Sequence, residues 1–185
     1  MYHISNDKRA VQSADLIYNG LLQCLEKKSF DQITVTDVQK ASGVARTTIY
    51  RCFDNLSDIL YWRCDLAFRE ALHATEPMNA PNELELMQGY FSYWMEHSDI
   101  LKLLIDINRQ DIIYACHMRN AEFLAQSYGK LPGMDETNAR YFMAIRTGVT
   151  ISILKAWLDG GRNETAEELL NILKRQFAFL SSAIL

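Results

Sequence analysis

Several polar side chains gathered on one short segment suit contacts with a nucleic acid. Arginine and threonine side chains hydrogen-bond to base edges, and arginine, threonine and tyrosine also bind phosphate oxygens. The segment interleaves such residues with Ile49 and Phe53, whose spacing is that of a buried helical face. The face left free of packing is expected to carry Arg46, Thr47, Thr48, Tyr50 and Arg51.

Two short helices around a glycine turn are predicted to position these side chains. Thr36 followed three residues later by Gln39 has the pattern of a capping box, so a helix is expected to start near Thr36. Gly43 tolerates the left-handed backbone that ends a helix. A second helix is expected over about Arg46 to Phe53. Two helices joined in this way form a helix-turn-helix, which places its second helix in the major groove of DNA.

The rest of the chain keeps a helical period and has no convincing strand pattern. Loops are predicted at Glu76–Asn82, which holds two prolines, and at Gly129–Gly133. Helices are expected over about residues 55–75, 83–97, 99–106, 110–128, 138–158 and from 165 onward. The prediction is an all-α protein of about nine helices, with a three-helix DNA-binding head over residues 1–55 and a regulatory and dimerisation domain over residues 56–185.

Charge is divided unevenly along the chain. The 185 residues are 49% hydrophobic, enough for a sizeable core, and carry a net charge of -4. Residues 1–60 hold seven basic and seven acidic residues, so the excess negative charge lies in the remainder. A neutral head can still present a basic face, and its affinity for DNA is expected to be modest and steeply salt dependent.

Other classes of function lack their signatures. The four cysteines show no C-x-x-C spacing, which predicts reduced thiols and no metal site. The absence of a long apolar run and of a signal-peptide core predicts a cytoplasmic protein with no membrane partner. No H-E-x-x-H, G-x-S-x-G or glycine-rich phosphate loop is present, so neither an enzyme nor a cofactor is expected.

The segment Gly43-Val-Ala-Arg-Thr-Thr-Ile-Tyr-Arg-Cys-Phe53 resembles the DNA-binding domain of the TetR (TetR/AcrR) family of bacterial transcriptional regulators. The resemblance covers roughly residues 8–66 and includes Phe30–Val38 and the apolar helix before it. It implies a homodimer that binds a palindromic DNA operator, most often a repressor released by a small effector.

Helix position and this resemblance together divide the expected DNA contacts into two groups. Base edges are assigned to Arg46, Thr47 and Thr48. Phosphates are assigned to Thr36, Tyr50 and Arg51, although Arg51 also suits a guanine.

Two positions depart from the family pattern. Ala45 stands where a serine or threonine commonly caps the recognition helix, and Leu56 stands where a lysine often contacts the DNA backbone. These departures motivate an alternative, in which the chain is a helical protein-interaction module that has lost specific DNA binding. An activator, or a regulator without an effector, is a further alternative.

The last two predicted helices are unusually apolar. Residues 138–158 are apolar on more than one side, and Thr165 with Glu168 forms a capping-box pattern before a long apolar stripe. Two such helices from each of two chains would form a four-helix bundle, whereas the alternative is a monomeric core. The family resemblance favours a dimer interface, which we assign to Ile145, Val149, Ile153, Trp157, Leu169, Leu173, Phe177 and Leu180.

The middle of the chain is rich in aromatic and sulfur-containing side chains. Ordinary core packing explains each of them, and the resemblance adds the alternative of a pocket for a small apolar or aromatic effector. The candidate lining residues are Tyr90, Trp94, Asn108, Tyr114, His117, Met118, Phe142 and Arg146.

Overall fold

The protein is all-α, as the sequence predicts. The computed structural model describes residues 1–5, 7–75, 83–127 and 136–184. Within these ranges the chain forms nine α-helices, one short 3₁₀ helix (η1) and no β-strand. In chain order they are α1 Lys8–Leu25, η1 Phe30–Gln32, α2 Val35–Ser42, α3 Arg46–Cys52, α4 Leu56–Thr75, α5 Glu83–Glu96, α6 Asp99–Asp106, α7 Gln110–Ser127, α8 Glu136–Asp159 and α9 Ala166–Ile184. The predicted loops at Glu76–Asn82 and Gly129–Gly133 lie outside the described residues.

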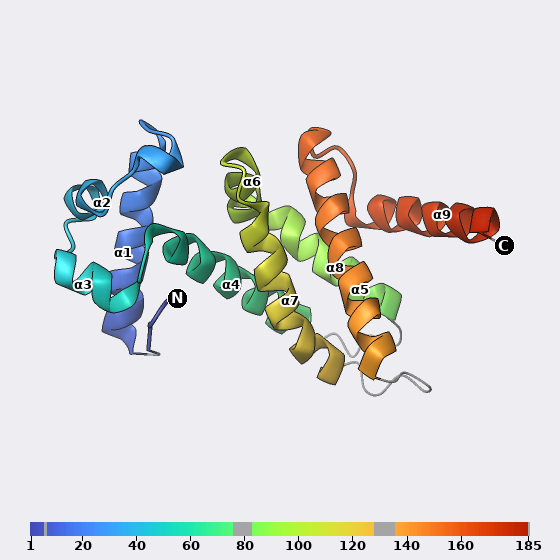
Figure 1. Cartoon of the computed structure of the whole chain (residues 1–185). Helices are drawn as coiled ribbons and strands as arrows, with labels where there is room; N and C mark the ends of the chain where they lie inside the picture. Colours follow the sequence, from blue (N-terminus) through green and yellow to red (C-terminus); the bar gives the residue numbers. More distant parts are fainter. Residues whose placement is uncertain (6, 76–82, 128–135, 185) are drawn as a thin grey trace.

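Helices α1 to α3 form a head at one end of the molecule, and α4 runs from this head into the body, which it forms together with α5 to α9 (Figure 1). The buried side of α1 carries Ala14, Ile17 and Leu21, spaced three and four residues apart. They join Val38 of α2 and Ile49 of α3 in one hydrophobic core. Burial of this shared face, rather than intrinsic helix propensity, holds helices as short as α2 and α3.

Two predicted helix starts are confirmed by their hydrogen bonds. At the start of α4, the Asp58 amide donates to Asn55 Oδ1 at 3.1 Å and the Asn55 amide donates to Asp58 Oδ2 at 3.1 Å. At the start of α9, the Thr165 amide donates to Glu168 Oε2 at 2.8 Å and the Glu168 amide donates to Thr165 Oγ1 at 3.3 Å. Each pair satisfies amides that a helix start otherwise leaves unbonded.

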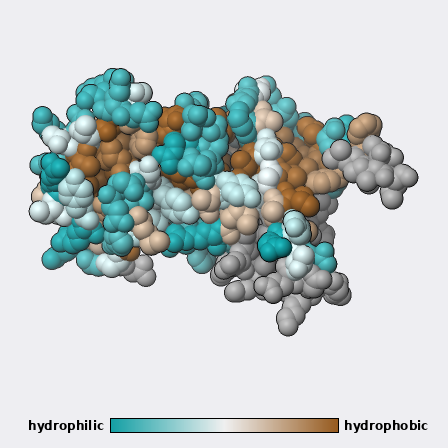
Figure 2. All heavy atoms as spheres, in the orientation of Figure 1, coloured by the Kyte–Doolittle hydropathy of each residue, from teal (hydrophilic) through white to brown (hydrophobic). Residues whose placement is uncertain are grey.

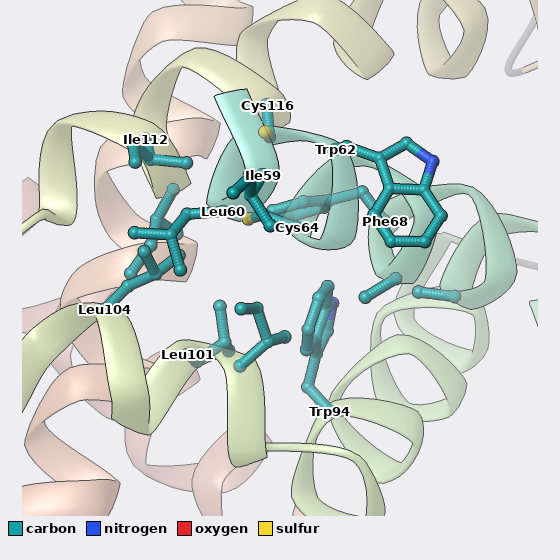
Figure 3. Close-up of a cluster of buried hydrophobic side chains, with 14 of the residues drawn as sticks. Ile59, Leu60, Trp62, Cys64, Phe68, Trp94, Leu101, Leu104, Ile112 and Cys116 are labelled. Atoms are coloured by element: carbon teal, nitrogen blue, oxygen red, sulfur yellow. The ribbon is translucent and has the colours of Figure 1, made fainter. Parts of the chain in front are cut away.

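The body is built around α4, which packs against α5, α6 and α7. Figure 3 shows side chains from these four helices meeting in one buried cluster, with Phe68 of α4 and Trp94 of α5 close together. Their ring centroids are 4.7 Å apart. The first half of α9 adds Leu170 and Leu173 to the core, while the second half extends away from the rest of the molecule (Figure 1).

Candidate DNA-binding interface

The turn between α2 and α3 has the geometry that the sequence predicts. Gly43 caps α2 with φ 67°, in the left-handed region that glycine occupies without strain, and its amide donates to Gln39 O. Helix α3 then begins at Arg46. Figure 1 shows α2 and α3 at the end of the molecule opposite α9. This end is therefore free to approach a DNA duplex.

Helix α3 has one buried face and one polar face. Ile49, Cys52 and the following Phe53 are buried in the head. The polar side chains opposite them are mostly open to solvent: Arg46, Thr47, Tyr50 and Arg51 are exposed, and Thr48 is half-buried. The structure thus brings five of the six predicted DNA-binding residues together on one short helix.

Arg46 and Tyr50 interact with each other on the open face of α3. The Arg46 guanidinium donates to the Tyr50 hydroxyl at 3.1 Å and its Cζ lies 5.4 Å from the ring centroid. Residues four apart lie on the same side of a helix, so this contact needs no distortion. Tyr50 holds the guanidinium over α3, and a phosphate or a base edge would compete for the same donors.

The predicted capping box at Thr36 is wrong, because the helix starts two residues earlier. The cap of α2 is Thr34, whose Oγ1 accepts from the Asp37 amide at 3.2 Å while the Thr34 amide donates to Asp37 Oδ2 at 2.9 Å. Lys28 Nζ also donates to Asp37 Oδ1 at 2.9 Å. Hydrogen bonds from Lys28 and from the hydroxyl and amide of Thr34 hold the pKa of Asp37 well below its usual range. Thr36 instead lies exposed in the first turn of α2, where its hydroxyl remains a candidate phosphate ligand.

Replacing Thr34 with alanine is expected to lower the free energy of unfolding by about 1 kcal/mol, because the side-chain hydrogen bonds between the Thr34 hydroxyl and Asp37 are lost. Thr36→Ala removes the same side-chain atoms from a neighbouring position. It is expected to change the free energy of unfolding by less than about 0.5 kcal/mol. Urea denaturation of both variants makes the comparison. Equal losses in the two variants would show that the cap has been assigned to the wrong residue.

The structure shows the consequences of both departures from the family pattern. Ala45 occupies the cap position of α3 without a side-chain hydrogen bond. Ser42 does not replace it within the described contacts, since its Oγ accepts from the Val44 amide at 3.2 Å. Leu56, the first residue of α4, is half-buried and packs against the core. Helix α3 is therefore held through Ile49 and Phe53 rather than through its cap.

Two features of the head were not predicted from the sequence. Residues 2 and 3 pair with the end of α3: Tyr2 forms an isolated antiparallel bridge with Phe53, and the His3 amide donates to Cys52 O at 2.8 Å. No local sequence pattern predicts a pairing across fifty residues. The other feature is Gly20, which lets α1 touch the backbone of Ser42 at the end of α2. A glycine within a strongly periodic apolar helix was the available signal.

The predicted effector residues are only partly brought together. Tyr90, Trp94 and His117 are buried next to one another, with the His117 ring centroid 6.2 Å from that of Tyr90. Thr147, which the sequence did not suggest, contacts His117 Nδ1 at 2.9 Å and donates to Met118 Sδ at 3.2 Å. The remaining candidates divide as follows: Phe142 is half-buried, Asn108 and Tyr114 are exposed, and the Arg146 side chain lies outside the described part of the chain.

The space beside His117 is small. A cavity of about 10 Å³ is lined by side chains of α4, α6, α7 and α8, among them Phe68, His117 and Thr150. This is about the room that one water molecule needs. Among the described residues, the Trp94 indole Nε1 is buried without a hydrogen-bond partner. An effector would have to move helices apart to enter this region.

The predicted dimer residues fall into three groups. Ile145 and Phe177 are 61% and 45% exposed. Val149 and Ile153 are half-buried. Trp157, Leu169 and Leu173 are already buried within the single protomer, and the Leu180 side chain lies outside the described residues. Figure 2 shows hydrophobic surface over α8 and α9, where Tyr141 and Phe179 are also exposed.

Within the described ranges, no helix is both long and apolar enough to span a bilayer. The same residues contain no group of three or more His, Cys, Asp or Glu side chains placed to hold a metal ion.

Comparison with solved structures identifies a chain of similar fold. The structure of the fatty acid degradation regulator FadR from Bacillus halodurans matches with a TM-score of 0.60 over 88% of this chain and 93% of that chain. The two sequences are 16% identical, so the similarity is one of fold. No family model matches the sequence, and a search of curated proteins finds no match. The fold is therefore the all-helical fold, with a helix-turn-helix at one end, that the sequence predicts.

Proposed function

We propose that this chain is a sequence-specific DNA-binding transcriptional regulator of the TetR type, which binds a palindromic operator as a homodimer. In this proposal α3 enters the major groove, Arg46, Thr47 and Thr48 approach base edges, and Thr36, Tyr50 and Arg51 contact phosphates. Half-sites about 34 to 36 Å apart, or a multiple of that distance, would match two recognition helices related by a two-fold axis.

The observation that carries this proposal is the two-sided character of α3. A helix of seven residues follows a left-handed Gly43 turn, buries Ile49 and Cys52, and directs four exposed polar side chains away from the protein. These exposed polar side chains contribute little to the packing of the hydrophobic core. They carry the donors that major-groove edges and phosphates accept. The similarity of fold to a protein named as a regulator supports the same role.

We propose repression, with release by a small apolar or aromatic effector, as the mode of action. Tyr90, Trp94 and His117 would contact the effector, and Trp94 Nε1 offers it a buried donor. Because the cavity beside His117 holds only about 10 Å³, the effector would bind a conformation in which α7 and α8 have separated. The affinity for DNA would then fall by the factor by which the effector binds that conformation more tightly than the DNA-binding one. The same small cavity favours a second candidate, a regulator that responds to no effector.

Selection of duplexes from a random pool by the full-length protein tests the DNA-binding proposal. Enrichment of a two-fold symmetric sequence, bound more weakly as salt increases, is the expected result. Lack of any enriched sequence at low salt would overturn the proposal and favour the protein-interaction alternative.

Because α8 and α9 expose apolar side chains, we expect charged substitutions on these helices to disrupt a dimer. Ile145→Glu combined with Phe177→Glu is expected to convert a dimer into a monomer, because each protomer would bury two charges at the contact. Leu16→Glu, at a similarly exposed leucine of α1, is the matched control and is expected to leave the dimer intact. Sedimentation velocity at micromolar concentration distinguishes the two states. A dimer that survives the double substitution would exclude this face as the interface.

A further inference from the structure

Residues 2–4, which we call the N-terminal strap, tie the end of the recognition helix to the body. The strap pairs with the chain just after α3 through the Tyr2–Phe53 bridge and through the hydrogen bond from the His3 amide to Cys52 O. Cys52 is the last residue of α3. Movement of the strap is therefore coupled through the backbone to the C-terminal end of the helix that carries Arg46 and Tyr50.

The side chain of Tyr2 points from the strap into the body. Its hydroxyl donates to Asp65 Oδ2 of α4 at 2.5 Å, a length typical of a bond to an ionised carboxylate. Burial and the hydrogen bond to Asp65 raise the pKa of Tyr2 to about 12, so the hydroxyl keeps its proton at neutral pH.

Asp65 collects partners from two helices although it is only 4% exposed. Asn120 of α7 donates to its Oδ1 at 3.0 Å, and Arg69 Nη2 lies 3.2 Å from its Oδ2. Arg119 Nη1 lies 3.9 Å from the same oxygen. A buried carboxylate is stable only when its oxygens are paired in this way. Asp65 is thus held by Asn120 and Arg69 in addition to Tyr2.

Helix α7 contributes a second contact to the strap. The Arg119 guanidinium carbon lies 5.7 Å from the ring centroids of both Tyr2 and Tyr61, and its Nη1 donates to the Tyr2 hydroxyl at 3.4 Å. Two residues earlier on α7, His117 contacts Thr147 of α8 at 2.9 Å. A shift of α7 against α8 would therefore reach the recognition helix through the strap as well as through α4.

We propose that Tyr2 and Asp65 are positioning residues for DNA binding, which hold the strap on α4 and α7 and so set the orientation of α3 relative to the body. This inference rests on the proposed DNA-binding function. It assigns the coupling between body and head to a hydrogen-bonded contact outside the helix-turn-helix.

The variant Tyr2→Phe tests the proposal because it keeps the ring and removes only the hydroxyl. Asp65 retains Asn120 and Arg69 as partners, so the protein is expected to fold. Tyr93→Phe is the matched control: the Tyr93 hydroxyl also donates to a carboxylate of α4, Glu70 at 3.2 Å, but both residues lie within the body. The two measurements are amide exchange of His3 by NMR and affinity for a duplex selected by the wild-type protein.

Tyr2→Phe is expected to speed His3 exchange by about tenfold and to weaken binding of the selected duplex by about three- to tenfold. Tyr93→Phe is expected to change neither quantity. Wild-type exchange of His3 in Tyr2→Phe, or wild-type affinity for the duplex, would overturn the proposal. If the wild-type protein selects no DNA, the proposed function fails, while the His3 exchange rate still decides whether the strap is held by Tyr2.

A double-mutant cycle with Asp65→Asn identifies the partner. If Tyr2 acts through Asp65, the two substitutions together speed His3 exchange by less than the product of their separate effects. If the double variant speeds His3 exchange by the product of the two separate effects, Asp65 is not the partner of Tyr2.

Discussion

Gly20→Ala is expected to lower the free energy of unfolding of the head by about 2 to 3 kcal/mol, a large effect for one methyl group. A Cβ at this position would lie 2.7 Å from Ser42 Cβ and 2.8 Å from the Ser42 amide nitrogen. These atoms belong to the end of α2, next to the Gly43 turn, and cannot rotate away. The clash would push α2 off α1 and displace α3, so DNA affinity is expected to fall with stability.

Gly148→Ala is the matched control, because an added Cβ at this helical glycine of α8 would meet no heavy atom within 4 Å in the described protomer, apart from its chain neighbours and the nearby backbone of its own helix. Alanine there is expected to be neutral or to stabilise the helix by up to about 1 kcal/mol. Denaturation curves of both variants, recorded by circular dichroism, give the comparison. If Gly20→Ala proved as stable as the wild type, the close packing of α1 on α2 would be incorrect.

Helix boundaries were largely predictable because they depend on neighbouring residues. The left-handed Gly43, the Asn55–Asp58 pair and the Thr165–Glu168 pair act within a few residues of the helix ends they set. The cap of α2 was misassigned because two threonines have the same local pattern. Thr34 and Thr36 each stand three residues before a polar side chain, and the ion pair from distant Lys28 to Asp37 favours the first of them.

Contacts between distant segments were not predictable from one sequence. Helical periodicity gives the spacing of an apolar face but not the helix it will meet. Tyr114 and His117 occupy the same predicted helix, yet the first is exposed and the second is buried against Thr147. The strap depends on hydrogen bonds across fifty to sixty residues, and no local pattern signals it.

Arg46→Ala is expected to weaken binding to the duplex selected by the wild-type protein by about 10- to 100-fold, the loss typical of one side chain that reads a base. Binding to a scrambled duplex, which depends on phosphate contacts, is expected to weaken by only a few-fold. Lys102→Ala removes one exposed positive charge from α6 in the body and controls for charge alone. Tyr50→Phe keeps the ring beside Arg46 and removes the hydroxyl, so both duplexes are expected to lose affinity equally.

The most direct test of DNA reading by α3 measures the affinities of the wild-type, Arg46→Ala and Lys102→Ala proteins for both duplexes by fluorescence anisotropy at one salt concentration. We expect only Arg46→Ala to lose the preference for the selected duplex over the scrambled one. If Arg46→Ala kept the wild-type preference, α3 would not be the element that reads DNA, and the proposed function would be contradicted.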